Sequence, residues 1–229
     1  MLTADENMEL TFIQMFSGID GFRLGLERSG WKCVWSNDND KYACIISRKN
    51  YQDGLLVERD IRDVEADTVP RHTLLTAGFP CQAFSVAGKR KGFEDTRGTL
   101  FYDIARIAEA KRPPLLLLEN VGGLLSAQKG YCFWRILETL DGLGYDVEWQ
   151  VLNSKHFGVP QNRERVFIVG HFRGGGTRQI FPIGQACEKS DYPCRKTSKK
   201  RKRLQLANTP SSRYYKDGSE NLIFQQHHK

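Results

Sequence analysis

The sequence predicts an α/β protein with a doubly wound, mostly parallel sheet, and two observations support this prediction. Along residues 10–172, short apolar runs alternate with segments whose apolar residues have helical spacing. Most of the apolar runs end at Gly, Pro, Asp or Asn, which are typical of loops. Strands that alternate with helices in this way form βαβ units, whose strands pair in parallel. We therefore expect one α/β domain over residues 1–172 and a basic C-terminal segment over residues 173–229.

The first half of the chain predicts strand–helix pairs in order. A strand at residues 10–16 ends in a glycine-bearing turn at 17–21, and the helix that follows ends at Gly30. A second strand, at residues 31–37, ends beside Asp38. The next helix begins at Asp40 and carries Tyr42, Ala43, Ile45 and Ile46. A short apolar piece at residues 55–57 then leads into Asp60 and Ile61.

The second half predicts four more strands. They lie at residues 72–77, 113–118, 145–152 and 165–170, and the second of them is expected to be fully buried. Helices are expected from residue 100 to 108 and from 133 to 143, and a long loop rich in glycine and charge from 83 to 99. The last fifty or so residues carry only short apolar islands such as 222–224. This composition alone is that of a disordered tail.

The composition is that of a globular protein, with 40% hydrophobic residues and 11% aromatic residues. No run approaches the roughly 20 apolar residues of a membrane span, and the N-terminus does not have the pattern of a signal peptide. The six cysteines form no C-x-x-C pair and have no histidines at zinc-site spacing. No metal site or disulfide framework is predicted, so we expect a cytoplasmic protein, associated with the nucleoid if it is bacterial.

The net charge of +7 is unevenly distributed. Residues 173–229 hold 13 Lys/Arg and 4 Asp/Glu, a net charge of +9, whereas residues 1–172 hold 21 and 23, a net charge of −2. Seven of the positive charges lie between residues 195 and 203. Such a run is often a solvated, disordered segment. It also suits contact with nucleic-acid phosphates, because clustered Lys and Arg displace counterions from DNA.

Three groups of reactive side chains lie at strand ends. Cys81 follows Pro80 at the end of the strand at residues 72–77, at the carboxyl end where open α/β sheets carry their chemistry. A lone cysteine is more often a small buried core residue. Here, however, Glu119 ends one further strand-like run, and Arg165 begins another. A thiol, a carboxylate and guanidinium groups favour nucleophilic attack on an electron-poor ring.

Four motifs occur in one order along the chain: FSGIDGF at 16–22, GFPCQAFS at 78–85, ENV at 119–121 and QNRER at 161–165. Together they resemble the DNA (cytosine-5) methyltransferases, especially those of bacterial restriction-modification systems. Residues 88–106 are similar to the same family, and the resemblance covers roughly residues 10–172. It implies a Rossmann-like, S-adenosylmethionine-dependent methyltransferase domain over residues 1–172.

The resemblance implies catalytic roles for four residues. Cys81 would add to C6 of cytosine, and Glu119 would protonate or hydrogen-bond the ring at N3. Arg165, together with Arg163, would hold the O2 side and favour the thiolate form of the cysteine. The base must leave the helix to react, so the loop at residues 83–99 is expected to act as a lid over DNA. The expected DNA contacts are Gln82, Ser85, Lys89 and Arg97.

The first turn at residues 17–21 does not match a dinucleotide fingerprint. G-x-G-x-x-G would need a glycine at position 20, where the chain has Asp20, and a carboxylate would repel a pyrophosphate. S-adenosylmethionine has no phosphates, and amides of the turn could hold its carboxylate. Asp38 is placed to accept the ribose hydroxyls. The resemblance implies a cofactor-binding set of Phe16, Ser17, Gly18, Ile19, Gly21, Asp38, Asn39, Asp60, Ile61, Pro80 and Leu100.

Two positions depart from the family pattern. The family usually has a second glycine where Asp20 stands, so the geometry of the turn is expected to differ. It often has an aromatic residue where Asn39 stands, so stacking on the adenine is expected to be weaker. Asp38 and Asp60 alone would more often be ordinary helix caps or loop carboxylates.

Family members usually continue with a target-recognition region and two later motifs, and the sequence contains neither motif. The chain is therefore expected to be one subunit of a split enzyme, a truncated chain, or an enzyme with a minimal recognition segment. In the first case a second subunit would supply target recognition and the missing motifs. The resemblance leaves residues 173–229 as either a partial target-recognition region or a disordered tail. A tRNA cytosine-5 methyltransferase and a non-catalytic subunit that binds DNA or a partner remain as alternatives.

Overall fold

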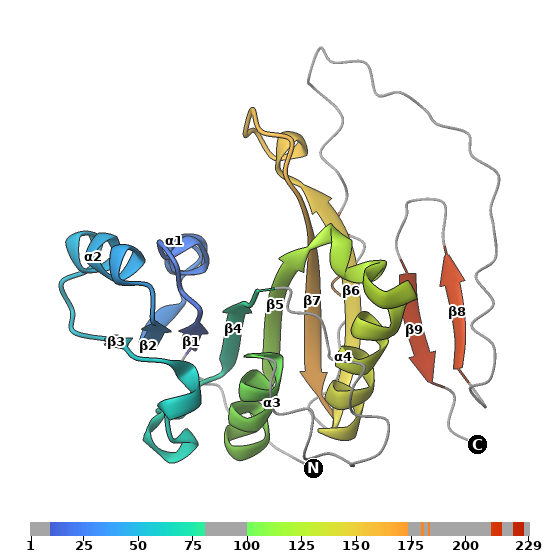
Figure 1. Cartoon of the computed structure of the whole chain (residues 1–229), viewed down its shortest axis with the longest axis horizontal. Helices are drawn as coiled ribbons and strands as arrows, with labels where there is room; N and C mark the ends of the chain where they lie inside the picture. Colours follow the sequence, from blue (N-terminus) through green and yellow to red (C-terminus); the bar gives the residue numbers. More distant parts are fainter. Residues whose placement is uncertain are drawn as a thin grey trace.

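The computed structural model describes residues 10–80 and 100–173, residues 180 and 183, and the backbone of two strands at 212–216 and 222–226. Within these residues one sheet runs through the molecule in the order β3-β2-β1-β4-β5-β7-β6-β9-β8 (Figure 1). No helix in the described residues is long and apolar enough to cross a bilayer.

The predicted strands and helices of the α/β domain are confirmed, with ends that shift by a few residues. The strands are β1 (Thr11–Met15), β2 (Lys32–Asp38), β3 (Leu56–Glu58), β4 (Leu74–Gly78), β5 (Leu115–Val121), β6 (Tyr145–Asn153) and β7 (Glu164–Phe172). Two further strands that were not predicted, β8 (Ser212–Lys216) and β9 (Leu222–Gln226), lie in the C-terminal segment. The helices are α1 (Gly21–Arg28), α2 (Lys41–Asn50), α3 (Leu100–Lys111) and α4 (Tyr131–Gly142), and several short 3₁₀ turns join them.

The doubly wound topology is confirmed as well. Strands β1 to β5 pair in parallel, with β1 between β2 and β4. From β1 the chain first adds β2 and β3 on one side, and then returns to add β4 and β5 on the other. The order reverses at β1 and β4, and in open α/β sheets ligands bind outside the carboxyl ends of the strands at such a point.

Among the described strands, two run opposite to the others, namely β9 and, next to β5, β7. Strand β7 runs antiparallel between β5 and β6, and Val121 at the end of β5 pairs with Arg165 near the start of β7. The reversed direction brings the beginning of β7 to the same sheet edge as the end of β5. Side chains of the ENV and QNRER motifs therefore meet at this edge.

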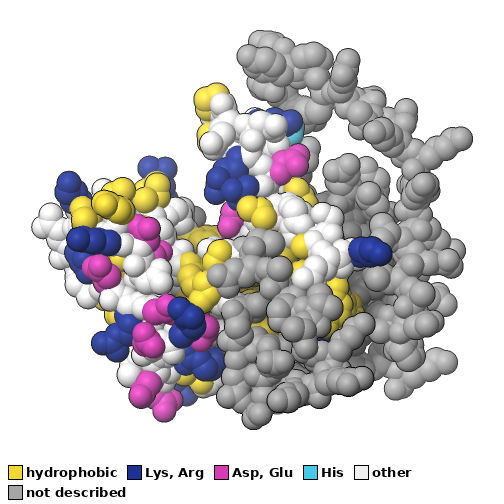
Figure 2. Space-filling model, in the orientation of Figure 1, with side chains coloured by type: hydrophobic (Ala, Val, Ile, Leu, Met, Phe, Trp, Pro, Cys, Tyr) yellow, Lys and Arg dark blue, Asp and Glu magenta, His cyan; other side chains and the backbone are white. Residues whose placement is uncertain are grey.

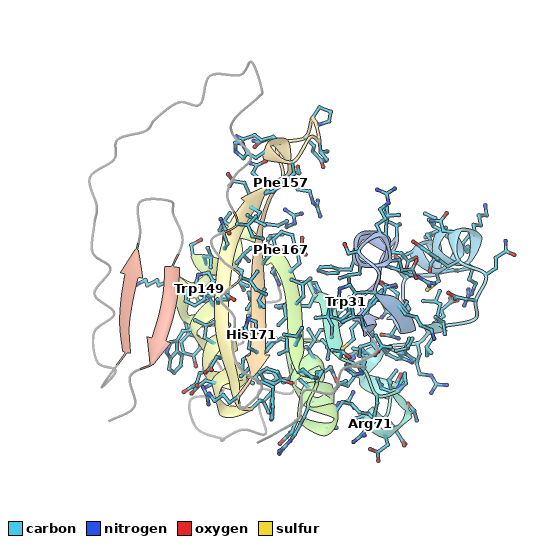
Figure 3. The ribbon with its side chains drawn as sticks, turned by 180° about the vertical axis from the view of Figure 1, so that it is seen from behind. Trp31, Arg71, Trp149, Phe157, Phe167 and His171 are labelled. Carbon is cyan, nitrogen blue, oxygen red and sulfur yellow. The ribbon has the colours of Figure 1, made fainter. Side chains whose placement is uncertain are left out.

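The sheet has two unequal apolar faces. Because successive strand residues point to opposite faces, Ile13 packs in the larger cluster with α3 and α4, whereas Phe12 packs in a smaller one with Leu26 of α1. Seen from behind, Trp149 of β6 lies within the sheet region (Figure 3). Its indole packs edge-on against Phe133 of α4, with ring centroids 5.1 Å apart. The larger face is therefore the main core.

The expectation that β5 is fully buried was wrong. Leu116 and Leu118 are fully buried, but Leu115 and Leu117 are only half-buried. The two half-buried leucines pack against the smaller cluster, on the face that α3 and α4 do not cover. An unbroken apolar run did not show that this strand has one well-covered face and one poorly covered face.

The apolar residues of α2 are largely exposed. Asp40 caps the helix as predicted, because its side chain accepts a hydrogen bond from the Ala43 amide. Tyr42, however, is 77% exposed, and Ile45 and Ile46 are also exposed. The buried residues of this helix are Cys44 and Ser47. Figure 2 shows apolar side chains gathered on the surface of the molecule over α1 and α2.

Candidate active site

The elements of the sheet bring most of the expected site residues to one edge. The cofactor turn follows β1, Asp38 ends β2, and Asp60 follows β3. Pro80 follows β4, and Glu119 lies near the end of β5. The register joins these ends, since Met15 pairs with Ala77, and Gly78 pairs with Glu119. In Figure 2 the surface is hollowed between the α1–α2 end and the projecting loop that joins β6 to β7.

Glu119 is bound to arginines of the QNRER motif. Its Oε1 accepts a bond from Nε of Arg165 at 2.8 Å and lies 4.0 Å from a guanidinium nitrogen of Arg163. The Glu119 and Arg165 side chains are about four-fifths buried, whereas that of Arg163 is half exposed. The sequence-predicted carboxylate and guanidiniums are thus brought together in a partly shielded place, where their attraction is stronger than in water.

Gly78 leaves room for this carboxylate. A Cβ at position 78 would lie 3.5 Å from Oε2 of Glu119, within van der Waals contact. Any larger side chain on this last residue of β4 would compete with Glu119 for the same space. The glycine of the GFPCQ motif therefore leaves space for the Glu119 side chain of the neighbouring strand β5.

Asn120 ties the ends of β4 and β5 together. Its side-chain amide donates to the Phe79 carbonyl at 2.9 Å, and the residue is 1% exposed. The side-chain oxygen accepts from the Val121 amide at 2.8 Å. The bond fixes the backbone two residues before position 81, so the ENV motif positions the start of the cysteine loop.

Cys81 and the expected DNA contacts Gln82, Ser85, Lys89 and Arg97 lie outside the described residues. The described cysteines, at positions 33, 44 and 132, are all buried. Burial raises the pKa of the Cys33 thiol to about 11, so this thiol stays protonated at neutral pH. It does not have the character of a nucleophile.

The cofactor turn has an unusual backbone. Phe16, Gly18 and Asp20 all have positive φ, at 55°, 55° and 67°. Left-handed backbone is unfavourable for residues with a Cβ, and such outliers concentrate at functional sites. The Ser17 amide donates to the Asn37 carbonyl at 3.0 Å, which ties the turn to β2.

The Asp38 carboxylate holds this turn through hydrogen bonds from backbone amides. One of its carboxylate oxygens accepts from the Gly18 amide at 2.7 Å, and the other accepts from the Asp40 amide at 2.8 Å. Each oxygen keeps a lone pair, so the carboxylate can still accept a ribose hydroxyl. The amides of Ile19 and Gly21 donate to no described residue. They remain as candidate donors to a carboxylate.

Asp60 stands at the end of β3 with its carboxylate held in place. Arg62 donates to it through its side chain and its backbone amide, and Asn39 adds a side-chain bond. The bonds from Arg62 lower the pKa of Asp60 to about 2, so the group is ionised at all physiological pH values. Asn39, one of the departures from the family pattern, thus joins the ends of β2 and β3.

Ile61 lies mainly in the core. Its side chain is 2% exposed and packs in the larger cluster, so only its backbone remains for contact with a ligand. Arg106 of α3 donates to the carbonyl oxygens of Ile61 at 3.0 Å and Val64 at 2.9 Å. Sequence reasoning missed Arg106, because its position in the helix gave no sign of a partner some 45 residues away.

The geometry agrees with what the comparisons with known proteins show. A family description, "C-5 cytosine-specific DNA methylase", matches residues 10–226, nearly the whole chain. The chain belongs to this family. Type II methyltransferase M.NlaX of Neisseria lactamica is 42% identical over 93% of this chain and 78% of its own length. M.HhaI of Haemophilus parahaemolyticus is 47% identical over 70% of this chain.

This member of the C-5 cytosine-specific DNA methylase family spans 48% of the length of M.HhaI. Among solved structures, Dnmt2 methyltransferase of S. pombe is similar, with a TM-score of 0.60, 25% identity and coverage of 75% of this chain and 53% of that chain. DNMT2 of Spodoptera frugiperda, at 21% identity and the same TM-score, covers 72% of this chain and 50% of its own and supports the fold alone.

The remaining expected contacts lie around the same edge. Ile19 is 65% exposed on the cofactor turn, Phe16 is half-buried before it, and Leu100 is half-buried at the start of α3. In the described part of the chain, no three His, Cys, Asp or Glu side chains are grouped so that they could hold a metal ion.

Proposed function

We propose that the chain is the catalytic part of a DNA (cytosine-5) methyltransferase of a restriction-modification system. It would transfer a methyl group from S-adenosylmethionine to C5 of a flipped-out cytosine. The observation that carries this proposal is the contact of Glu119 with Arg165, beside the strand end that leads to Cys81. Family membership supports the reaction class.

The proposed reaction begins with the thiolate of Cys81. It forms a bond to C6 of the cytosine, while Glu119 donates a proton or hydrogen bond to N3 and so limits the charge that builds on the ring. Arg165 orients Glu119 and, with Arg163, faces the O2 side of the base. Once C5 carries the methyl group, its proton passes to solvent water, the electrons of that C–H bond form the C5–C6 double bond, and the Cys81 sulfur leaves C6 as a thiolate. N3 returns to Glu119 any proton it received, so both side chains end in their starting forms.

S-adenosylmethionine would supply the electrophilic methyl group, and the turn after β1 fits it. A buried polar atom without a described partner, Oγ of Ser17, lies in this turn. A ligand with several hydrogen-bonding groups suits such a place better than an apolar ligand would. The amides of Ile19 and Gly21 would hold its carboxylate, and Asp38 would accept the ribose hydroxyls. Asp60 and the backbone of Ile61 would receive the adenine.

DNA contacts are proposed for Gln82, which would fill the space left by the base, and for Ser85, Lys89 and Arg97 at the phosphates. The β6–β7 loop adds a second candidate surface for DNA. Figure 3 shows Phe157 at the far end of this loop. Its side chain is 44% exposed, and Val159 is 47% exposed.

A second subunit is proposed to supply target recognition. The exposed apolar residues of α1 and α2 support it, because a contiguous apolar surface on a soluble domain marks an interaction site. Those with the largest exposure are Tyr42, Leu24 and Ile46. The chain would then contribute the chemistry, and its partner the choice of sequence.

Covalent trapping tests the proposed function. Duplex DNA that contains 5-fluorocytosine should form a stable adduct with the protein and S-adenosylmethionine, because fluorine cannot leave C5 as a proton does. The adduct should be absent in Cys81→Ser and present in Cys33→Ser, a matched change at a buried thiol. An adduct that persists in Cys81→Ser would refute the mechanism. The reaction is run with and without a candidate recognition subunit, and on tRNA, since activity on tRNA alone would replace DNA as the substrate.

A further inference from the structure

Asp20 stands at the head of α1 but does not cap the helix. It occupies the N-cap position with φ 67° and ψ 35°, and its side chain makes no capping bond. An N-cap residue normally has extended backbone and turns its side chain onto the first helical amides. Asp20 instead has left-handed backbone and is 1% exposed. Something other than helix capping holds this residue.

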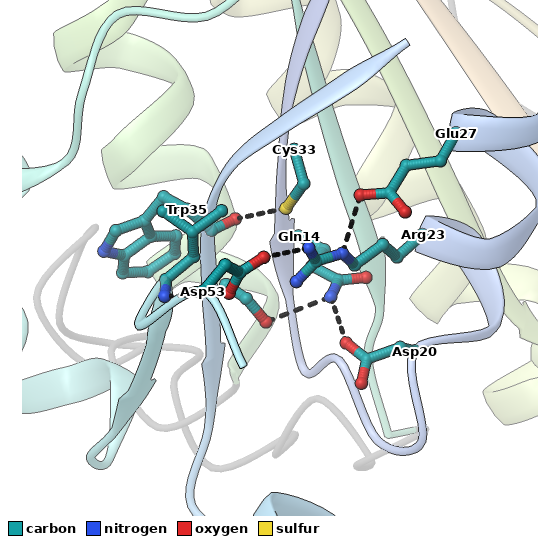
Figure 4. Close-up of polar contacts among 9 residues, drawn as sticks. Gln14, Asp20, Arg23, Glu27, Cys33, Trp35 and Asp53 are labelled. Carbon is teal, nitrogen blue, oxygen red and sulfur yellow. Dashed lines mark hydrogen bonds and ion pairs between the residues drawn. The ribbon is translucent and has the colours of Figure 1, made fainter. Parts of the chain in front are cut away.

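The side chain of Asp20 is held by Gln14, in the middle of β1. The Gln14 amide nitrogen donates both to Oδ1 of Asp20 and to Oγ of Ser36 on β2, the latter at 3.0 Å (Figure 4). Gln14 and Ser36 are fully buried. The three side chains form a polar cluster inside the sheet layer, which we term the Gln14 cluster.

Gln14 is the one described donor to the Asp20 carboxylate, whose second oxygen is buried without a described partner. Burial of a carboxylate is unfavourable unless hydrogen bonds compensate. Left-handed backbone is also unfavourable for a residue with a Cβ, although Asp tolerates it better than most. Both costs fall on one residue, and the bond from Gln14 opposes them.

We propose that Gln14 is a positioning residue for the cofactor turn, acting through Asp20. By holding the Asp20 side chain, it keeps residue 20 in left-handed backbone and so fixes the loop between β1 and α1. That loop presents the amides of Ile19 and Gly21 and the Gly18 amide that Asp38 braces. The proposal rests on the proposed binding of S-adenosylmethionine at this turn.

Replacing Asp20 with glycine should remove the need for Gln14. Glycine adopts left-handed backbone without strain and has no carboxylate to bury. In an Asp20→Gly protein, the bond from Gln14 is therefore no longer needed. Loss of Gln14 should harm the turn only while Asp20 is present.

The test compares four proteins: the wild-type chain, Gln14→Leu, Asp20→Gly and the double variant. Affinity for S-adenosylmethionine is measured by calorimetry, at a temperature where all are folded. Gln14→Leu should weaken binding about tenfold or more, since a bond to a charged group is removed. Asp20→Gly should stay within about threefold of wild type, and the double variant should match Asp20→Gly.

Thr76→Val is the control that distinguishes a general loss of stability from a loss of positioning at the cofactor turn. Thr76 pairs with Gln14 in the sheet, is fully buried, and donates to the Ile13 carbonyl at 3.0 Å, but it does not contact the turn. This variant should be less stable than wild type with unchanged affinity. If Thr76→Val weakens binding as much as Gln14→Leu does, or if the double variant binds as poorly as Gln14→Leu, the proposal is overturned.

Urea unfolding of the same proteins keeps this inference distinct from the proposed function. If the wild-type chain does not bind S-adenosylmethionine, the proposed function fails. The Gln14 cluster is still tested, because Gln14→Leu should lower the unfolding midpoint much more in the wild-type background than in Asp20→Gly. A folded protein recovered only in the double variant also supports the proposal. If Gln14→Leu and the double variant both fail to fold, Asp20 is not the cause and the proposal fails.

Discussion

At the scale of single residues, the candidate site depends on partners that come from neighbouring strands. Glu119 of β5 contacts Arg165 of β7, and Asn120 reaches back to the Phe79 carbonyl after β4. In both cases a side chain at one strand end fixes the backbone or the charge at another. Loss of one partner should therefore affect chemistry that a different strand carries.

Asn120→Asp tests this dependence. The change removes the donor to the Phe79 carbonyl and places a carboxylate against that oxygen, at a site that is 1% exposed. We expect a loss of about 1–3 kcal/mol in the free energy of unfolding. The rate of adduct formation on 5-fluorocytosine DNA should fall roughly ten- to a hundredfold, because the loop that carries Cys81 is no longer anchored.

Asn162→Asp is a matched control for that experiment. Its side-chain oxygen accepts from Asn153 at 2.7 Å, so a carboxylate keeps the bond. Adduct formation and stability should remain near wild type. An Asn120→Asp protein with normal trapping kinetics would show that the β4–β5 bond does not position the nucleophile.

At the scale of elements, the pairing of β5 with β7 permits almost no change in side-chain volume. Gly170 of β7 lies opposite Leu116 of β5, which is fully buried. A Cβ on Gly170 would lie 3.1 to 3.3 Å from three atoms of the Leu116 side chain. This close approach allows β7 to enter between β5 and β6.

Gly170→Ala should therefore destabilise the protein. We expect the free energy of unfolding to fall by about 1–3 kcal/mol, the usual effect of overpacking, as measured by urea denaturation. Gly25→Ala, within α1 and with no atom within 4 Å of its added Cβ, should instead raise stability by about 0.5–1 kcal/mol. Equal effects of the two changes would contradict the packing explanation.

Much of this fold could be predicted from the sequence, because apolar runs and their glycine or proline ends are local signals. The positions of β1 and β4 were predicted closely for that reason, whereas β5 runs on to Val121, past its expected end at residue 118. The exposed face of α2 was not, since apolar spacing at Tyr42 and Ile45 does not show which side of a helix is covered. Arg23 is buried in α1 between Glu27 and Asp53, and that could not be seen without the partners.

The candidate site was predictable only as a set of strand ends. The resemblance supplied Glu119 and Arg165, and the register of β5 with β7 explains how they meet. The role of Gln14 depends on the left-handed backbone of Asp20, which a sequence does not reveal. Roles that depend on buried hydrogen bonds between distant positions therefore could not be predicted from the sequence.

At the scale of the whole molecule, charge is separated from chemistry. Residues 1–172, which contain the candidate site, have a net charge of −2, and residues 173–229 have a net charge of +9. A domain of net charge −2 gains little from general attraction to DNA. We therefore expect affinity for DNA to come from the basic segment, from a second subunit, or from both.

Neutralising the seven Lys and Arg residues between 195 and 203 tests the first source. DNA binding should weaken on all sequences alike, because phosphate contacts carry no sequence information. The dependence of log affinity on log salt should also flatten, by about 0.9 for each phosphate that the segment no longer neutralises. Fluorescence anisotropy over a salt series measures both effects. Unchanged affinity and slope would place the DNA-binding charge elsewhere.

The position of β7 also has a consequence for the order in which the protein is made. Ribosomes release a chain from its N-terminus, and here β5 emerges roughly forty residues before the strand that must lie beside it. Until β7 has emerged, β5 has an open edge, and Glu119 lacks Arg165. The nascent polypeptide can therefore build its cofactor half early, but it cannot assemble its charged catalytic pair. Synthesis itself thus delays the chemistry until the sheet is nearly whole.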